Sequence, residues 1–421
     1  MLGCGVVGSN VARLLSENKA DFAERSGAEL VLTKVAVRNK NLVRDHVPAE
    51  LLTTDAQSVV NDPEIQIVIE VMGGINPARE LLLAAIESGK SVITANKALL
   101  AQHGAELFEA AHKKGVDLYY EAAVGGAIPI LRPLRESLVG DHVKRIMGIV
   151  NGTTNYILTK MDEEGSDFST VLKEAQKLGY AEADPTADVE GHDAAAKAAI
   201  LAGLAFHTRV TIDDVSCEGI SRISSRDIQV ARDIDHVIKL LAIAEITDTQ
   251  EISVRVHPTL VPRHHPLASV RNAFNAVFVE AESAGDLMFY GRGAGGAPTA
   301  SAVLGDLIAI ARNIARGGAG HGESDYADLP IAAPGSSTTR YLIRLDVADR
   351  PGVLASVAQI FASHSVSIET VRQSGHGDSA ELIVMTHQAL ESTLAATVAA
   401  LAQSDVVKSV ESVLRVESSR S

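Results

Sequence analysis

The chain has 421 residues, of which 46% are hydrophobic and 22% are charged, values typical of a folded protein with two or three domains and not of a disordered one. Its formal net charge of −15 argues against nucleic acid as a partner, because no excess of basic side chains is available for a phosphate backbone. The two cysteines, Cys4 and Cys217, provide no disulfide framework, and no run reaches the roughly eighteen apolar residues of a membrane span, so we expect a cytoplasmic protein with no membrane partner.

Residues 1–125 alternate between apolar, strand-like runs and helical patterns. The predicted helices cover 78–88 and 101–114, and the predicted strands cover 30–37, 65–71, 91–94 and 116–120. Strands that alternate with helices form parallel sheets with right-handed crossovers. This part of the sequence therefore predicts a Rossmann-like, doubly wound parallel α/β domain.

A glycine-rich segment opens this domain and leads into a predicted helix over 9–17. Gly3-Cys4-Gly5-Val6-Val7-Gly8 matches the pattern G-x-G-x-x-G. The first glycine of that pattern allows a tight turn, the second admits a pyrophosphate, and the third lets helix and strand pack closely. Such a segment is often only a turn, but its place in a strand-helix series favours dinucleotide binding by Gly3, Gly5, Val6, Val7 and Gly8.

Only Met1 and Leu2 precede this segment, whereas the motif needs a buried strand of about five or six residues before its first glycine. In the strand order 3-2-1-4-5-6 that strand is central, so its neighbours would lose hydrogen-bond partners without it. We therefore expect the natural polypeptide to begin upstream, with most of the first strand missing from this sequence.

The strand predicted over 30–37, which is the second strand of the motif, is followed by the basic residues Arg38 and Lys40. The acidic residue that usually holds the ribose of NAD is not found at this place. A basic side chain at this place can pair with the 2′-phosphate of NADP. The sequence favours NADP, although NAD use stays open and both residues could equally be solvated charges at a strand end.

The pattern changes after Gly125-Gly126 to Ala-rich helices mixed with strands such as 143–150 and 252–256, so we assign 126–297 to a separate α+β domain, to which the family resemblance given below adds the catalytic and dimerisation roles. A helix over 298–316 is expected to return to the first domain, and a Gly-, Ser- and Pro-rich linker covers 317–338. Residues 339–421 show the order βαββαβ, which predicts a ferredoxin-like domain. Its strands cover 341–347, 366–372, 380–386 and 406–416, and its helices cover 352–364 and 390–403.

Asp193 and Lys197 are four residues apart in a predicted helix, so both side chains project from the same helix face. An exposed ion pair is the usual explanation of this spacing. Here the helix continues as the almost wholly apolar run 198–206, so Lys197 lies where a charge needs a partner or a catalytic task.

An ordered set of stretches resembles the homoserine dehydrogenase family over nearly the whole chain. No single stretch would be specific, but the set is. Besides residues 3–8, it comprises Val71-Met72-Gly73-Gly74, Thr94-Ala95-Asn96-Lys97, Glu121-Ala122-Ala123-Val124-Gly125-Gly126-Ala127-Ile128-Pro129, Asn151-Gly152-Thr153-Thr154-Asn155, Leu178-Gly179-Tyr180-Ala181-Glu182-Ala183-Asp184-Pro185, Asp188, and Gly191-His192-Asp193-Ala194-Ala195-Ala196-Lys197.

The resemblance implies reversible hydride transfer between L-homoserine and L-aspartate 4-semialdehyde, in the biosynthesis of threonine, methionine and isoleucine. An alcohol loses hydride readily only when its hydroxyl proton is also removed, so an acid/base group is needed. By resemblance, Lys197 is the principal candidate, oriented by Asp193, and Lys97 is a second catalytic lysine at the nicotinamide end. The sequence leaves open which lysine moves the proton.

The same resemblance assigns further residues. Glu182 matches the ligand of the substrate's amino group, with Asp188 close by, although both could equally be helix caps or solvated charges. The loop 121–128 resembles a monovalent cation site, although a glycine-rich loop can be only a hinge. The remaining assignments are Thr153 and Tyr180 for the substrate, Gly73, Gly74, Thr94, Lys97 and Gly295 for the cofactor, and Glu121 with the carbonyls of Val124, Gly126 and Ile128 for sodium.

The segment Asp349-Arg350-Pro351-Gly352-Val353-Leu354 looks like the first turn of an ACT domain, a family of small amino-acid-sensing folds. Gly352 would let an effector approach the backbone near Asp349, and paired modules usually bury the effector at an interface. We therefore expect a homo-oligomer that responds to an amino acid, with threonine expected from the pathway. A purely structural dimerisation domain is the alternative.

Two other functions stay open. One is another ACT-bearing dehydrogenase such as 3-phosphoglycerate dehydrogenase, which places its dinucleotide domain mid-chain. The other is an amino-acid sensor with a disabled Rossmann domain, which the short first strand favours and the two lysines oppose. His257, His264 and His265 invite a metal interpretation, but without Cys or acidic ligands at matching spacing we expect a surface loop and no transition metal.

Overall fold

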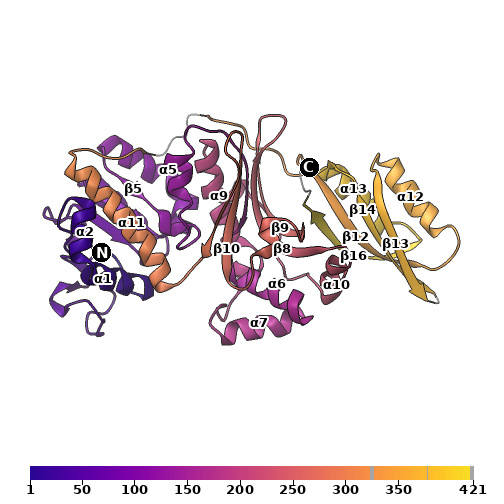
Figure 1. The fold of residues 1–421 in the computed structure, drawn as a ribbon, viewed down its shortest axis with the longest axis horizontal. Helices are drawn as coiled ribbons and strands as arrows, with labels where there is room; N and C mark the ends of the chain where they lie inside the picture. Colours follow the sequence, from indigo (N-terminus) through magenta and orange to yellow (C-terminus); the bar gives the residue numbers. More distant parts are fainter. Residues whose placement is uncertain (323–326, 377, 418–421) are drawn as a thin grey trace. The chain divides into compact units, whose positions relative to one another are not determined.

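The computed structural model describes residues 1–322, 327–376 and 378–417 (Figure 1). The chain forms two compact units, each built from segments that are far apart in the sequence. The first unit comprises Met1–Gly152, Asp193–Val215 and Phe274–Leu329, and the second comprises Thr153–His192, Ser216–Ala273 and Pro330–Ser421. Among the described residues, no helix is both long and apolar enough to cross a membrane.

A parallel sheet of short strands forms the N-terminal part of the first unit. Leu2 lies in its middle, because it pairs with Ala36 of β1 on one side and with Glu70 of β3 on the other. The order is β2, β1, Leu2, β3, β4, β5, which is the predicted order 3-2-1-4-5-6. The strands are β1 (Val35–Ala36), β2 (Leu52–Thr53), β3 (Ile67–Glu70), β4 (Ser91–Thr94) and β5 (Leu118–Tyr119).

The strand predicted over 30–37 is much shorter than expected, since only Val35–Ala36 is a strand. Its inner neighbours are Met1 and Leu2, which pair with it at residues 34–36. Residues 30–34 alternate between exposed and half-buried side chains and join no ladder. The apolar pattern was therefore a poor guide to the length of this strand.

Helix α11 is far from the sheet in sequence but packs along α1, where Figure 1 shows it beside the indigo N-terminal helix. Val11 and Leu15 of α1 share one buried core with Val303 and Leu307 of α11 and with Ile69 of β3. The helices of this part are α1 (Val6–Glu17), α2 (Lys19–Ser26), α3 (Gln57–Val60), α4 (Ala78–Glu87), α5 (Lys97–Lys114) and α11 (Gly296–Ala315).

The remainder of the first unit contains antiparallel strands and one buried helix. β10 pairs with β6 on one side and with β11 on the other. Helix α9 is buried along nearly its whole length, as its apolar sequence predicts. The elements are β6 (Val143–Ile149), α9 (His192–Phe206), β10 (Phe274–Ala281) and β11 (Gly285–Arg292), with single turns at η2 (Glu121–Ala123), η3 (Pro133–Ser137) and η4 (Ile212–Asp214).

The second unit is built around the long antiparallel pair β8 and β9, whose strands are buried on both faces over most of their length. β7 joins β9 in parallel. The elements before the C-terminal domain are α6 (Gly152–Glu164), α7 (Phe168–Lys177), α8 (Thr186–Val189), β7 (Ser216–Cys217), α10 (Ser225–Asp233), β8 (His236–Ile246), β9 (Ile252–Pro262) and η5 (Pro266–Ser269).

The C-terminal domain has the predicted ferredoxin-like order βαββαβ, with an antiparallel sheet in the order β16-β12-β14-β13. β16 also pairs in parallel with β9 at Arg415 and Val416, so this sheet continues the strand pair of the same unit. The elements are β12 (Thr338–Ala348), α12 (Val353–Ser363), β13 (Ile368–His376), β14 (Ser379–Thr386), β15 (Ala389–Leu390), α13 (Glu391–Ala402) and β16 (Val407–Val416).

The predicted surface loop holds for His264 and His265 but not for His257. His257 is buried in β9, where its Nδ1 lies 2.9 Å from the hydroxyl of Thr259, and His264 and His265 follow in a turn. The prediction was wrong for His257 because β9 is buried on both faces and tolerates a histidine that has a local partner. Within the described residues, no group of three or more His, Cys, Asp or Glu side chains could hold a metal ion.

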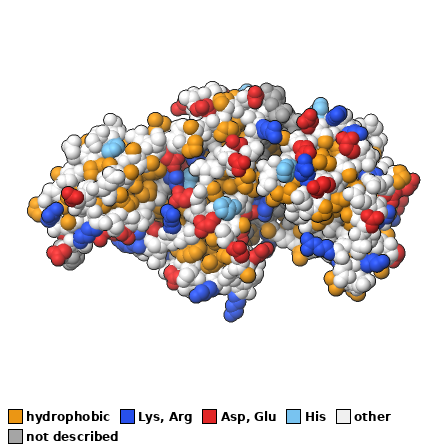
Figure 2. Space-filling model, turned by 180° about the vertical axis from the view of Figure 1, so that it is seen from behind, with side chains coloured by type: hydrophobic (Ala, Val, Ile, Leu, Met, Phe, Trp, Pro, Cys, Tyr) orange, Lys and Arg blue, Asp and Glu red, His pale blue; other side chains and the backbone are white. Residues whose placement is uncertain are grey.

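Residues 323–326 of the predicted linker lie outside the described residues, and beyond them Ile331 forms a β-bridge with Ile252 of β9. On the face seen in Figure 2, acidic and basic side chains are interspersed among hydrophobic ones, which agrees with a net charge that is spread over the surface.

Asp306 of α11 is a buried carboxyl that joins this helix to the segment after β5. It accepts hydrogen bonds from the backbone N–H of Glu121 at 2.8 Å and from the guanidinium of Arg132 at 2.6 Å. Burial, and secondly the charge of Glu121, raise the pKa of Asp306 to about 7 although Arg132 acts in the opposite direction.

This pKa predicts a stability that falls as pH rises. Because the pKa of Asp306 is higher in the folded chain than in the unfolded chain, the folded chain holds an extra proton between about pH 4 and about pH 7. Over about pH 5 to 8 the free energy of unfolding should decline by about 2 kcal/mol more in the native chain than in Asp306→Asn. Chemical unfolding of the first unit at several pH values measures the difference.

Asp141→Asn is the matched control. Backbone N–H groups of Ser283 and Ala284 hold the pKa of Asp141 below its ordinary value, so Asp141 does not titrate in this pH range. The Asp141→Asn curve should run parallel to that of the native chain. Equal pH slopes for Asp306→Asn and the native chain would contradict the prediction.

Candidate active site

The strongest cluster of functional groups in the first unit is a carboxylate shared by two lysines. Asp193 lies in the first turn of α9, Lys197 lies one turn later, and Lys97 is the first residue of α5. Nζ of Lys197 is 2.7 Å from Oδ2 of Asp193, and Nζ of Lys97 forms an ion pair with Oδ1. The structure therefore brings the three predicted catalytic residues together.

This cluster combines burial with charge. The side chains of Asp193 and Lys197 are 7% and 10% exposed, whereas that of Lys97 is 44% exposed. Burial would raise the pKa of Asp193, but the charges of Lys197 and Lys97 and their hydrogen bonds outweigh it and hold this pKa below its ordinary value. With both lysines protonated the three groups carry one net positive charge, which suits a substrate oxygen that gains negative charge.

Two groups at the end of β6 position this cluster, and neither was assigned a role from the sequence. Asn151 donates from Nδ2 to Oδ2 of Asp193 at 2.8 Å, and the carbonyl of Val150 accepts from Nζ of Lys197 at 2.7 Å. Asn151 belongs to a stretch that marked the family resemblance, from which only Thr153 was assigned. The sequence feature that could have identified Asn151 is an amide side chain at the end of a buried strand.

Gly3 and Gly8 have the turn and packing roles that the pattern predicts, and the pyrophosphate role of Gly5 stays a prediction. Gly3 has φ of +94°, and a Cβ there would lie 2.9 Å from the backbone of Met72. A Cβ at Gly8 would lie 2.7 Å from the carbonyl oxygen of Gly3, so α1 packs directly on the turn. A Cβ at Gly5 would meet open space among the described residues. Gly5 is therefore the position at which a ligand can approach the backbone.

The loops beside the fingerprint are shaped by a buried glutamate. Glu70 at the end of β3 accepts from the N–H groups of Met72 and Gly73 through Oε1, and from the hydroxyl of Thr94 through Oε2 at 2.6 Å. Thr94 is fully buried, and its hydroxyl orders the loop through Glu70, while its predicted contact with the cofactor stays a prediction. Asn96 donates to the carbonyl of Gly74 and caps α5, which begins at Lys97.

The remaining predicted cofactor residues lie around the same turn. Val6 is exposed and Val7 is half-buried in the first turn of α1. Gly295 directly precedes α11, and Gly296 packs against Val6 without room for a Cβ.

Arg38 and Lys40 are both exposed after β1. Arg44 contacts their loop, because it donates to the carbonyls of Asn39 and Cys4 at 2.9 and 3.4 Å. Arg44 was not predicted, and it fastens this basic loop to the fingerprint.

The predicted cation loop is closed by Glu121. Its carboxylate accepts the N–H groups of Ile130 and Leu131 through one oxygen and that of Arg132 through the other, at 2.7 to 2.9 Å. Gly126 packs on the backbone of Gly293, so the loop lies against the glycine-dense stretch before α11. Glu121 is thus an organiser of the loop whether or not it also holds an ion.

The predicted substrate residues lie in the second unit. Glu182 is exposed in the loop between α7 and α8, and Asp188 is half-buried within α8. The hydroxyl of Thr153 donates to the carbonyl of Tyr180 at 2.6 Å, and the ring of Tyr180 lies 4.8 Å from that of Tyr156. Thr153 and Tyr180 therefore brace the loop that carries Glu182.

The predicted effector turn follows β12. Gly352 has φ of +93° and precedes α12, and Asp349 is exposed beside it. The positive φ explains why glycine occupies this position.

Similarity to known proteins shows the family to which the chain belongs. A family model described as the NAD binding domain of homoserine dehydrogenase matches residues 3–121, one described as homoserine dehydrogenase matches 129–308, and an ACT domain model matches 341–405. The homoserine dehydrogenase of Corynebacterium glutamicum is 57% identical over 99% of this chain and 95% of its own length. The chain belongs to the homoserine dehydrogenase family.

Solved structures of this family agree with the fold. The crystal structure of the homoserine dehydrogenase from Thiobacillus denitrificans has 41% sequence identity to this chain and a TM-score of 0.95. The match covers 99% of this chain and 97% of that protein's chain. A hyperthermophilic archaeal homoserine dehydrogenase in complex with NADPH is 27% identical, covers 73% of this chain and 95% of its own, and gives a TM-score of 0.63. The chain is thus an oxidoreductase with a nucleotide-binding domain and an ACT domain.

The fingerprint allows two glycine substitutions with different outcomes. Gly8→Ala should destabilise the first unit by about 1 to 3 kcal/mol, because the new methyl group meets the carbonyl of Gly3. Gly5→Ala should leave the melting temperature nearly unchanged but weaken NADPH binding by about tenfold or more, because the fingerprint pattern predicts the pyrophosphate at this open position.

Thermal melting and fluorescence titration with NADPH measure the two effects. Each variant serves as the control for the other, since both add one methyl group to the fingerprint. Tight NADPH binding by Gly5→Ala would place the pyrophosphate elsewhere.

Proposed function

We propose that this chain reduces L-aspartate 4-semialdehyde to L-homoserine reversibly, with NADPH as the hydride donor, and that Lys97, Asp193 and Lys197 form its catalytic centre. The observation that carries the proposal is the carboxylate of Asp193 shared between two lysines from different helices. NADPH supplies the hydride from its nicotinamide ring when bound. The protein must supply and receive the proton of the substrate oxygen.

Lys197 is the proposed proton donor during reduction. Its ammonium is fixed by the carboxylate of Asp193 and by the carbonyl of Val150, so its direction is set by two hydrogen bonds. During homoserine oxidation the same nitrogen takes the proton back. Lys97, the more exposed lysine, is the proposed second catalytic group at the nicotinamide end, and it supports the negative charge of the substrate oxygen.

Glu182 and Asp188 are the proposed ligands of the substrate's ammonium group, since carboxylates are its natural partners. Thr153 and Tyr180 support them by holding the loop between α7 and α8.

NADP is the proposed cofactor, with NAD as an alternative. The exposed, basic loop with Arg38 and Lys40 suits a 2′-phosphate, and a relative of known structure is in complex with NADPH. The proposed contacts of the pyrophosphate and nicotinamide are the backbone of the fingerprint, the turn at Gly73 and Gly74, and Gly295.

Sodium is proposed to bind the carbonyls of Val124, Gly126 and Ile128 beside Glu121, because oxygen ligands suit a hard cation. For the ACT domain we propose an amino-acid effector at Asp349 and Gly352, with threonine expected, and a homo-oligomer whose paired ACT domains enclose it. Both cysteines are free, as is usual in a reducing compartment, and the cytoplasm is therefore the proposed location of the protein.

Replacement of Lys197 tests the catalytic centre. Lys197→Ala should lower kcat for homoserine oxidation by about a hundredfold or more, while Kd for NADPH stays within about twofold. The control is Lys160→Ala, which removes another lysine of an i,i+4 pair, with Glu164 on α6, and should leave both constants unchanged. Steady-state kinetics and NADPH titration give the two readouts. Unchanged turnover in Lys197→Ala would remove it from the mechanism.

Arg38 allows a test of cofactor choice. Arg38→Ala should weaken NADPH binding by about tenfold or more and leave NADH binding nearly unchanged, because only NADPH carries the 2′-phosphate. Arg25→Ala, which removes an exposed arginine of α2 paired with Asp21, serves as the control and should change neither affinity. Equal weakening of both cofactors in Arg38→Ala would argue for a structural role.

A further inference from the structure

The ACT domain holds a ten-residue segment of the second unit at both of its ends. This segment, residues 218–227, starts directly after β7 and ends in the first turn of α10, and we call it the strap. At its first end, Arg415 of β16 donates to Glu218 at 2.6 Å. At its last end, Arg344 of β12 donates to Asp227 at 2.9 Å. Both strands belong to the ACT sheet, so two neighbouring strands fix the two ends of one segment.

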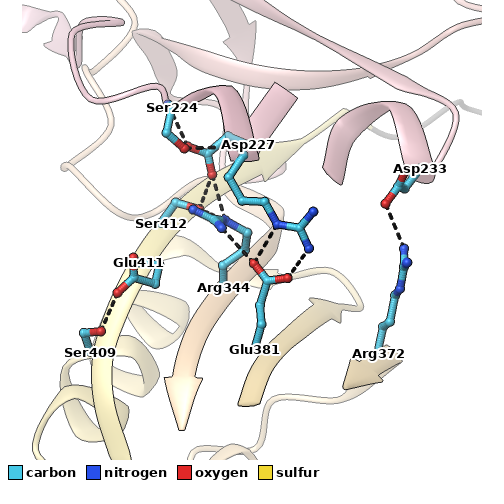
Figure 3. Close-up of polar contacts among 10 residues, drawn as sticks. Ser224, Asp227, Asp233, Arg344, Arg372, Glu381, Ser409, Glu411 and Ser412 are labelled. Atoms are coloured by element: carbon cyan, nitrogen blue, oxygen red, sulfur yellow. Dashed lines mark hydrogen bonds and ion pairs between the residues drawn. The ribbon is translucent and has the colours of Figure 1, made fainter. Parts of the chain in front are cut away.

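Asp227 is the central group of the second attachment (Figure 3). Its Oδ1 accepts from Arg344 and from the hydroxyl of Ser412 at 2.6 Å, both on the ACT sheet. Its Oδ2 accepts from the N–H and the hydroxyl of Ser224, which starts α10. One carboxylate therefore both begins the helix and binds the ACT domain. The side chains of Asp227 and Arg344 are 1% and 6% exposed, so neither charge has water as a substitute partner.

A neighbouring pair extends this attachment. Glu381 of β14 accepts from Arg344 at 2.9 Å and forms a second ion pair with Arg226, the residue before Asp227 (Figure 3). Three strands of the ACT sheet thus contribute side chains to the last end of the strap.

The beginning of the strap, just after Glu218, packs on the chain that directly follows Asp188. Ile220 donates its N–H to the carbonyl of Val189 at 2.8 Å. A Cβ at Gly219 would lie only 2.3 Å from the same carbonyl, so no side chain fits between the two segments. Just before the strap, the thiol of Cys217 donates to the carbonyl of Glu190, and a Cβ at Gly191 would lie 2.9 Å from its sulfur.

We propose that the strap is a positioning element through which the ACT domain sets the place of α8 and hence of Asp188. The inference rests on the proposed role of Asp188 as a substrate ligand. The contact between strap and α8 is made by backbone atoms without spare volume, so a displaced strap must move the α8 turn or lose the Ile220 bond. Arg344 and Arg415 are accordingly positioning residues that act from outside the substrate site.

A third ion pair between the same two parts supplies the matched control. Arg372 of β13 binds Asp233 at 3.0 Å, at the last residue of α10 and away from the strap. Figure 3 shows it apart from the Asp227 group. Its removal loosens the junction between ACT domain and α10 without releasing an end of the strap.

The test uses the full chain with Arg415→Gln, Arg344→Gln and Arg372→Gln. Hydrogen exchange at the Ile220 amide should become about tenfold faster in the first two variants and stay unchanged in Arg372→Gln. KM for homoserine should rise by about fivefold or more in the first two, with kcat changed by less than about twofold and NADPH affinity unchanged. These readouts separate a positioning role from general loss of stability.

The proposal would be overturned if Arg415→Gln kept the native exchange rate at Ile220 and the native KM for homoserine. It would also be overturned if Arg372→Gln accelerated exchange at Ile220 as much as Arg415→Gln does. Because Arg344 is buried, Arg344→Gln could fail to fold, and Arg344→Lys then replaces it. Arg344→Lys keeps the charge and should fall between the native chain and Arg415→Gln in both readouts.

Asp188→Asn separates this inference from the proposed function. If Asp188→Asn leaves KM for homoserine unchanged, the role of Asp188 fails. The exchange rate of Ile220 then still decides whether the ACT domain holds the strap against α8.

Discussion

The carboxylate of Asp193 binds two lysines that arrive from different parts of the chain, and the surrounding structure must satisfy this buried arrangement. A charge with so little exposure is stable only where cations and hydrogen-bond donors surround it. The start of α5, the start of α9 and the end of β6 therefore have to meet at one point. The N-terminal turn of α9 also favours an anion at Asp193, because unpaired N–H groups leave partial positive charge there.

The parallel sheet explains why the other functional loops lie near this point. Parallel strands share one direction, so their carboxyl ends lie at one edge of the sheet. Gly3 follows Leu2, the turn at Gly73 follows β3, Lys97 follows β4, and Glu121 follows β5. Each is thus placed by the strand before it. The buried bonds of Glu70 to the next two loops then hold this edge together, which a cofactor site of backbone amides requires.

Local spacing predicted the part of the site that depends on local geometry. Asp193 and Lys197 share a helix face because they are four residues apart, and the glycines of the fingerprint fix their own turn. Contacts between distant residues had no such signal. The bond between Glu70 and Thr94 was missed because the two residues are 24 positions apart, on neighbouring strands.

Two other errors have the same origin. His257 has the polarity of a surface residue, but pairing of β9 on both sides buries it. The apolar run 30–37 has the composition of a strand, but its length depends on the residues that pair beside it. The order of elements in the ACT domain was predictable because each element carries its own periodicity, whereas its pairing with β9 was not.

The way the ACT domain is joined to its neighbour has a consequence for how it can move. An apolar interface tolerates small sliding, because its attraction depends weakly on direction. The junction here combines a strand pairing with buried ion pairs at Asp227, and both require a fixed register. A shift of the ACT sheet by even part of a residue would leave a buried carboxylate without its cation. Such a junction therefore favours a few discrete arrangements over continuous drift, which is the property a sensor domain needs to change a distant site.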